Sequence, residues 1–252
     1  PDGSTPEDDF LPGALTECFV ATDVWSMVMA YDDSKFADAK PSTPADFFDT
    51  AGFPGKRTLR KGAKFNLEFA LMADGVAPAD VYDVLGTPEG VDQAFAKLDT
   101  IKGDVVWWEA GAQPPQLLAD GEVTMAYAFN GRIFNAAIGE NKPFNIVWTG
   151  QVYEMEGWII PKGAPNKENA LKYIAFTTEA ERLARAAELI SYGPTRKSSA
   201  DLVGNVDGKD IAMSPHLPTT PGNIEQGINS SADFWVDHDS ELSERFNAWL
   251  AS

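Results

Sequence analysis

The sequence predicts an α/β protein. Short apolar runs of strand type alternate along the chain with helical patterns of roughly 10–15 residues, and this order is typical of strands joined by helical crossovers. The composition, with 44% hydrophobic and 23% charged residues among 252, is that of a globular protein. We therefore expect mainly parallel sheets covered by helices, in one large domain or two smaller ones.

Five segments have the composition of strands, because they are rich in valine, isoleucine and aromatic residues. The first, VWSMVMAY, is almost wholly apolar and is expected to be buried. The predicted strands are residues 24–31, 104–109, 122–129, 144–148 and 152–161.

Nine segments fit helices, several opened by proline or closed by glycine. The predicted helices are residues 44–50, 65–74, 78–85, 88–102, 115–120, 130–138, 166–177, 179–190 and 234–251. No element is assigned to residues 55–64 (GKRTLRKGAK), where five basic residues reverse the local charge. Residues 192–231 are expected to be rich in loops.

The charge balance excludes several partners. Twenty Lys and Arg oppose 38 Asp and Glu, which gives a net charge of −18. So acidic a chain is poorly suited to bind nucleic acid or an anionic membrane surface. The chain starts at Pro1, so we expect either a removed signal or a start that was cut elsewhere.

Motifs for catalysis, metal and cofactors are missing. The single Cys18 excludes an internal disulfide and a cysteine-based zinc site, and His216 and His238 are too far apart for a His-x-x-x-His pair. Residues 237–241 (DHDSE) resemble a calcium loop only superficially, because the glycine at the sixth position is missing. We expect no metal, no cofactor and no catalytic residue.

Two segments carry candidate ligand-binding groups. Arg132 stands where a predicted strand passes into a helix, and a basic residue there opposes the helix dipole. It is either a surface arginine paired with a carboxylate or a guanidinium that grips a ligand carboxylate. Glu154 and Glu156 fall at i and i+2 of a predicted strand, so they share one face. That face is either a solvated edge or an acidic wall for a cationic ligand.

The chain resembles a known family at these segments, the periplasmic solute-binding proteins of ABC importers, in the spermidine/putrescine-binding branch. The similar stretches include VVWWEAGAQPPQLLADGEVTMAYAFNGRIFNAAI, GQVYEMEGWIIPKGAPNKENALKYIAF and SYGPTRKSS. The resemblance implies a two-lobed periplasmic binding protein-like fold of type II, in which hinge strands join the lobes and a ligand is trapped between them. It also implies a periplasmic location and an ABC permease as partner in the inner membrane.

The resemblance further implies a division into lobes. Residues 1–30 and 160–252 would form lobe one with the hinge, and residues 31–159 lobe two. Members of the family carry a longer N-terminal part, so we expect the first lobe to be incomplete here. It would then expose a sheet edge and an apolar face. We expect dimerisation, a second chain or fragment that completes the lobe, or weak ligand affinity.

The resemblance assigns the ligand site residue by residue. It implies that Glu156 binds an amine and that the aromatic rings of Phe129 and Tyr192 contact the ligand. Polyamine binders place an aspartate where this chain has Arg132. A basic residue would repel a polycation, so the expected ligand is a small zwitterion of the 4-aminobutyrate type. The candidate binding residues are Phe129, Arg132, Glu154, Glu156, Tyr192 and Trp25.

Four other functions remain open from the residues alone. The chain could bind putrescine or spermidine, or it could be an enzyme that uses paired carboxylates, such as a glycosidase or lyase. A ferric-ion binder of the same fold would need adjacent tyrosines near Tyr192, and the sequence there is Ser-Tyr-Gly. An interaction protein without a small ligand is the fourth.

Overall fold

The computed structural model describes residues 5–252, and contacts within the chain divide it into two compact units. Unit 1 combines the chain up to Ser26 with Tyr153–Ile224, and unit 2 combines Met27–Val152 with Glu225–Ser252. The division predicted from the sequence placed residues 225–252 in lobe one. They lie instead with unit 2, because the last helix packs on helices of that unit.

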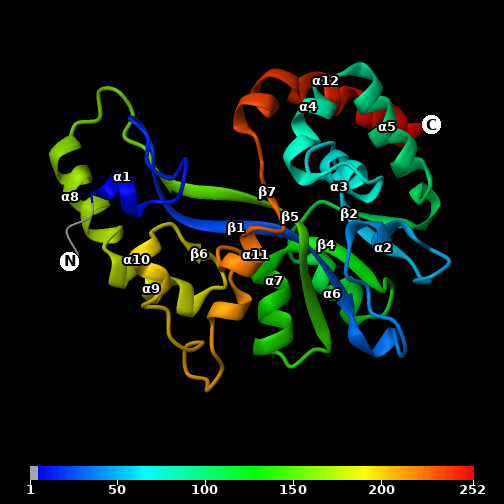
Figure 1. Cartoon of the computed structure of the whole chain (residues 1–252), viewed down its shortest axis with the longest axis horizontal. Coiled ribbons are helices and arrows are strands. Elements are labelled where there is room, and N and C mark those ends of the chain that lie inside the picture. Colours follow the sequence, from blue (N-terminus) through cyan, green and yellow to red (C-terminus); the bar gives the residue numbers. More distant parts are fainter. Residues whose placement is uncertain (1–4) are drawn as a thin grey trace. The chain divides into compact units, whose positions relative to one another are not determined.

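Unit 1 is built from short elements around the ends of two long strands, β1 and β5 (Figure 1). Strand β1 spans Val20–Asp32 and β5 spans Phe144–Trp158, and each continues into unit 2. The other elements are α1 (Pro6–Asp9), α8 (Lys167–Thr177), α9 (Ala180–Leu189), β6 (Gly193–Pro194), α10 (Lys197–Ala200), the 3₁₀ turn η5 (Ser214–His216) and α11 (Pro221–Ile224).

Unit 2 contains most of the sheet and the larger helices. Its first elements are the turn η1 (Asp33–Lys35), α2 (Pro44–Phe48), β2 (Arg57–Arg60), α3 (Asn66–Ala73), the turn η2 (Pro78–Asp80), α4 (Val81–Leu85), α5 (Pro88–Asp99) and the turn η3 (Lys102–Asp104). They are followed by β3 (Val105–Trp108), α6 (Gln113–Ala119), β4 (Met125–Phe129), α7 (Asn130–Phe134), the π-helical η4 (Asn135–Gly139), β7 (Ile228–Asn229) and α12 (Ala232–Ala251). The α/β class predicted from the sequence is confirmed.

The sheet is mixed rather than mainly parallel. Its strand order is β3-β2-β4-β1-β5-β7, with β6 also paired to β1. Strand β2 is parallel to β3 and to β4, whereas β1 is antiparallel to both β4 and β6. The helical crossovers make β2, β3 and β4 parallel. The alternation of elements along the sequence could not show that β1 enters beside β4 in the opposite direction.

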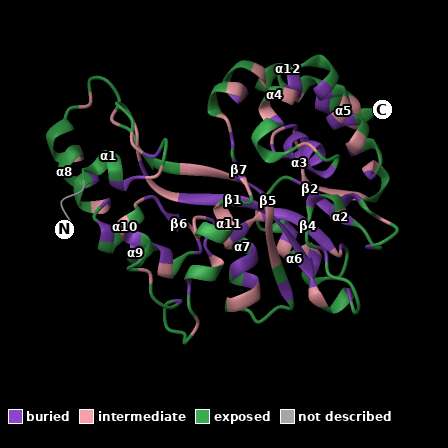
Figure 2. Ribbon diagram, viewed as in Figure 1, coloured by how far each residue is buried: buried purple, intermediate pink, exposed green. Residues whose placement is uncertain are grey.

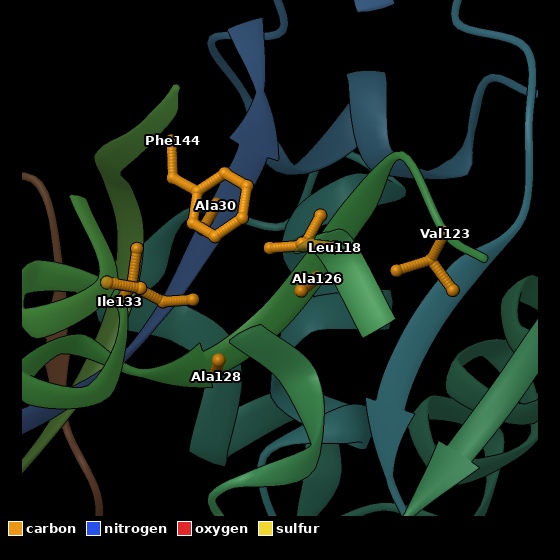
Figure 3. Close-up of a cluster of buried hydrophobic side chains, with 8 residues drawn as sticks. Ala30, Leu118, Val123, Ala126, Ala128, Ile133 and Phe144 are labelled. Carbon is orange, nitrogen blue, oxygen red and sulfur yellow. The ribbon is translucent and has the colours of Figure 1, made fainter. Parts of the chain in front are cut away.

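A cluster of small and branched side chains fills one face of the unit 2 sheet. Ala30 of β1 and two alanines of β4 lie beneath Leu118, Ile133 and Phe144 (Figure 3). The alanines, Ala126 and Ala128, leave room for α6 and α7 to approach the strands closely. The position of α7, and with it of Arg132, therefore depends on this cluster. Helix α3 is buried along its whole length (Figure 2).

Two predicted strands, 144–148 and 152–161, are one strand, β5. Residues 149–151 lie outside both predicted strands, but the strand continues through them. Gly150 has φ +74° and donates its N–H to the carbonyl of Gln226. A Cβ at this position would lie 2.4 Å from Cγ of Pro44, so the glycine lets β5 approach the start of α2 closely.

Strand β2 was missed in the sequence because its four residues include two arginines. Arg57 is fully buried at its start. Its guanidinium donates from Nε to the carbonyl of Phe47 at 2.9 Å and from Nη2 to that of Asp49 at 3.0 Å, with further bonds to the carbonyls of Phe53 and Gly55. Burial lowers the pKa of the guanidinium. This one side chain therefore fixes the loop between α2 and β2.

A second buried group anchors the C-terminal helix. Glu68 of α3 is fully buried and accepts hydrogen bonds at Oε1 from Trp235 Nε1 of α12 at 2.8 Å and from the Tyr82 hydroxyl of α4 at 3.0 Å. Further along α12, Trp249 Nε1 donates to Asp99 of α5 at 2.6 Å. Burial raises the pKa of the Glu68 carboxyl to about 7, although the bonds from Trp235 and Tyr82 partly offset it.

Large apolar side chains are exposed on unit 1, mainly on α8 and α9 and the segments beside them. They are Trp158, Ile159, Leu171, Tyr173, Phe176, Leu189, Ile190 and Leu202. The idea that a second chain covers such a face stays a prediction. In residues 5–252, no helix is both long and apolar enough to cross a membrane.

We expect Arg57→Lys to lower the free energy of unfolding by about 3 kcal/mol, because lysine keeps the buried charge but cannot reach all four carbonyls. Urea denaturation followed by circular dichroism measures the loss. Arg60→Lys, on the same strand but only partly buried, is the matched control. Equal stability of the two variants would contradict the role given to Arg57.

We expect Glu68→Gln to gain stability over the wild type as the pH rises. The folded pKa of about 7 lies above the unfolded value near 4.5. The favourable contribution of the wild-type carboxyl is therefore complete below pH 4.5 and is lost as the pH rises through 7, about 3 kcal/mol in all. Glutamine keeps the acceptor oxygen and does not titrate. Denaturation at pH 5 and pH 8 measures the difference, with the exposed Glu181→Gln as control.

Candidate functional site

The predicted binding residues divide between the units. Trp25, Glu154, Glu156 and Tyr192 belong to unit 1, whereas Phe129 and Arg132 belong to unit 2. Each group is therefore described within its own unit.

Unit 1 contains a cavity of about 360 Å³ at the point where β1, β5 and β6 meet helix α9. Glu156 lies on its wall beside Tyr192. The other lining residues are Thr22, Asp23, Trp158, Thr177, Leu183, Ala186, Ala187, Ile190, Gly193 and Pro194. Among these described residues are two carboxylates and no basic side chain, so the cavity wall combines acidic and apolar side chains.

The second carboxylate, Asp23, was not among the predicted site residues. It lies in β1 opposite Pro194 of β6 and accepts a hydrogen bond at Oδ2 from the Thr22 hydroxyl at 2.8 Å. The predicted strand began one residue later, at Val24. The available signal was an aspartate with apolar residues on both sides in a strand-like run, Val-Ala-Thr-Asp-Val-Trp.

The two carboxylates influence each other. Burial raises the pKa of the Asp23 carboxyl, the hydrogen bond from Thr22 lowers it in part, and the negative charge of Glu156 raises it further. A backbone link supports the pair, because the Thr22 hydroxyl also lies 3.2 Å from the carbonyl oxygen of Glu156. Bringing two negative charges to one cavity costs free energy, which a bound cation would offset.

Glycines allow the strands to come together here. A Cβ on Gly157 would lie 2.3 Å from the carbonyl oxygen of Val20, so only glycine lets β5 run this close to β1. A Cβ on Gly193 would lie 2.2 Å from the Thr219 hydroxyl. Both glycines are next to cavity residues, and the close backbone packing therefore sets the separation of Glu156, Asp23 and Tyr192.

The remaining predicted residues of unit 1 lie elsewhere. Trp25 is buried in β1, and Glu154 lies on β5 with partial exposure, but neither lines the cavity. Met155, on the opposite face of β5 from Glu154 and Glu156, packs against the cluster around Phe10. The two glutamates therefore share a face as the spacing predicted, and only Glu156 reaches the cavity.

In unit 2, Arg132 is exposed near the start of α7 and lines a hollow of about 280 Å³ between α6 and η4. Asp120, Glu140 and Lys142 line the same hollow, so it is mixed in charge. Phe129, the residue before α7, is half-buried and meets the ring of Trp108 edge-on at 5.5 Å.

The basic run before α3 also lies in unit 2. Arg60 and Lys64 are 5.9 and 5.5 Å from the centre of the buried ring of Phe65, and Lys61 forms an ion pair with Glu109 at 3.0 Å. Phe65 has a φ of +75°, which is rare for a non-glycine residue. Unit 2 therefore combines cations at Arg132 and at this run with nearby carboxylates, whereas the described lining of the unit 1 cavity has carboxylates and no basic side chain.

Comparison with known proteins gives a family match over most of the chain. Residues 4–219 match the model described as bacterial extracellular solute-binding protein. The chain is 52% identical over 242 residues to the gamma-aminobutyric acid-binding protein of Pseudomonas aeruginosa, which covers 96% of this chain. It spans 66% of the length of that protein.

Solved structures agree with this match. A binding protein of Agrobacterium tumefaciens B6, MotA, in complex with glucopine, has a TM-score of 0.83 at 30% identity, covering 98% of this chain and 75% of its own. A structure described as a GABA receptor has a TM-score of 0.79 at 34% identity, covering 97% of this chain and 72% of its own.

We expect Glu156→Gln to lower the pKa of the Asp23 carboxyl, because the neighbouring negative charge that raises it is removed. Titration of the labelled Asp23 carboxyl carbon by NMR measures this shift. The matched control is Glu154→Gln, on the same face of β5 but outside the cavity. An unchanged titration of Asp23 in Glu156→Gln would show that the two carboxylates do not interact.

Proposed function

The chain belongs to the family of bacterial extracellular solute-binding proteins, and we propose that it is a receptor for a small amine-bearing solute. In this proposal it binds the solute in the periplasm and delivers it to an ABC permease in the inner membrane. The observation that carries the proposal is the cavity of unit 1, where Asp23 and Glu156 meet without a basic residue among the described lining. Two carboxylates in a partly apolar cavity favour a cationic group.

The size and walls of the cavity support a small ligand. About 360 Å³ is at the low end of the range for small-molecule pockets. The aromatic rings of Tyr192 and Trp158 and the apolar side chains of α9 border it. Rings of this kind can pack on a methylene chain or face an ammonium group. A short alkylamine therefore suits both ends of the cavity.

We further propose that the solute is zwitterionic, of the 4-aminobutyrate type. The 52% identical relative is a gamma-aminobutyric acid-binding protein. Arg132, with its planar fork of donors, suits a carboxylate, and it would repel a polycation. In this proposal Asp23, Glu156 and Tyr192 of unit 1 bind the amine end of the ligand.

A polyamine is the second candidate ligand, since the acidic cavity of unit 1 by itself suits putrescine as well as a zwitterion. The two ligands differ at Arg132, which helps only a ligand with a carboxylate. An enzyme that uses the Asp23 and Glu156 carboxylates is the candidate from another class. It would convert its ligand, whereas a receptor would be stabilised by the ligand and return it unchanged. Thermal shift followed by mass spectrometry of the recovered ligand separates these two.

We expect the chain to bind 4-aminobutyrate more tightly than putrescine in isothermal titration calorimetry at low salt. Arg132→Ala should weaken 4-aminobutyrate at least about 30-fold, because removing one partner of a close charge pair costs about 2–5 kcal/mol. Putrescine affinity should stay equal or rise, since the variant removes a repulsive charge.

The control is Arg182→Ala, an exposed arginine of α9 paired with Glu179, the residue just before that helix. Tight putrescine binding without a response to 4-aminobutyrate would overturn the zwitterion proposal. Unchanged 4-aminobutyrate affinity in Arg132→Ala would remove Arg132 from the site.

A further inference from the structure

We propose that Asp23 is the residue by which the cavity selects a ligand ammonium that carries N–H donors and rejects a fully methylated one. Asp23 is assigned this role because its Oδ1 is buried without a hydrogen-bond partner in the described part of the chain. The inference rests on the proposed function, since it concerns the amine end of the same ligand.

The two oxygens of Asp23 are in different states. Oδ2 accepts the hydrogen bond from the Thr22 hydroxyl at 2.8 Å. Oδ1 is removed from solvent and accepts none. A hydroxyl has a single proton, so Thr22 cannot satisfy both oxygens of the carboxylate. An ionised carboxylate with one oxygen unpaired and buried is costly, so the carboxylate retains an unmet need for a donor.

The protein offers few donors at this position. The residue opposite Asp23 in β6 is Pro194, which has no backbone N–H. The side chains that border the cavity include no Lys, Arg or His among the described residues. The Glu156 carboxylate accepts hydrogen bonds and cannot supply one when ionised. The Tyr192 and Thr177 hydroxyls and the Trp158 indole also border the cavity, but none of them donates to Oδ1. A ligand that enters the cavity can supply the missing donor.

A primary ammonium meets this need. It has three N–H donors and a positive charge, so it can bond Asp23 and still face Glu156. The torsion that turns the Asp23 carboxylate is broad, so a partial rotation can bring Oδ1 toward the cavity when an ammonium enters. A trimethylammonium group has the same charge but no N–H, and it would leave Oδ1 unpaired.

The aromatic walls argue for the opposite selectivity. Trp158 and Tyr192 line the same cavity, and aromatic rings recognise quaternary ammonium groups by cation–π attraction. Charge alone therefore predicts no preference, ring contact alone predicts a preference for the methylated cation, and the unpaired oxygen of Asp23 predicts a preference for the primary one. The three mechanisms therefore predict different changes of affinity when the ligand ammonium is methylated. Charge alone predicts no change, ring contact predicts an increase and the unpaired oxygen predicts a decrease.

The test is calorimetry on the 252-residue chain with 4-aminobutyrate and its N-methyl, N,N-dimethyl and N,N,N-trimethyl derivatives. These probes share length and charge and carry three, two, one and no N–H donors. We expect the main loss of affinity, about 5- to 150-fold, at the trimethyl compound, because it alone lacks an N–H donor and leaves one buried acceptor unpaired. Asp23→Asn should weaken the primary amine most and so flatten the series. Its melting temperature checks that the variant is folded.

The control is Asp201→Asn, an exposed aspartate of unit 1 that does not line the cavity. A series that stays equally steep in Asp23→Asn and in the wild type would overturn the role of Asp23. Equal or increasing affinity along the series in the wild type would overturn the selectivity while leaving the proposed function intact. Failure of every probe and of putrescine to bind would overturn the proposed function itself.

Discussion

One strand, β1, takes part in both compact units, and much of the structure depends on it. Its first residues pair with β6 at Asp23 and Val24, within unit 1. Its last residues, from Met27 to Tyr31, pair with β4 within unit 2 and are buried on both faces. A strand that serves two units cannot shift its register without disturbing both of them. The fixed register of β1 holds Asp23 in place in unit 1. In unit 2 it supports α7, because Ala30 of β1 belongs to the buried cluster that also contains Ile133 of α7.

Charge separates the two units at their candidate binding residues. The cavity of unit 1 has Asp23 and Glu156, whose mutual repulsion and burial raise the pKa of Asp23. Unit 2 has Arg132 and the cations around Phe65. The net charge of −18 therefore describes the whole surface and not the sites. A binding protein needs such local imbalance, because a site that satisfies its own charges gains little from a ligand.

Buried polar groups that join several elements give unit 2 its rigidity. Arg57 binds four carbonyls of one loop, and Glu68 joins α3, α4 and α12. Each would be costly if a partner were removed. Glu68 Oε2 and Asp23 Oδ1 are both buried without a hydrogen-bond partner in the described chain, but of the two only Asp23 lines the cavity of unit 1. In the proposal above, its place on the cavity makes Asp23 a binding residue, whereas Glu68 joins helices of unit 2.

The sequence by itself determined the α/β class, most helices of unit 2 with their proline and glycine ends, and the shared face of Glu154 and Glu156, because these depend on local periodicity and backbone preference. It did not reveal that β5 is continuous, that β2 carries a buried arginine, or that residues 225–252 pack on unit 2. Only tertiary contacts decide these points. The same holds for the site: the chain's spacing identified Glu156, but Asp23 became visible only when β1, β5 and β6 enclosed one cavity, since burial and a missing partner are properties of the folded state.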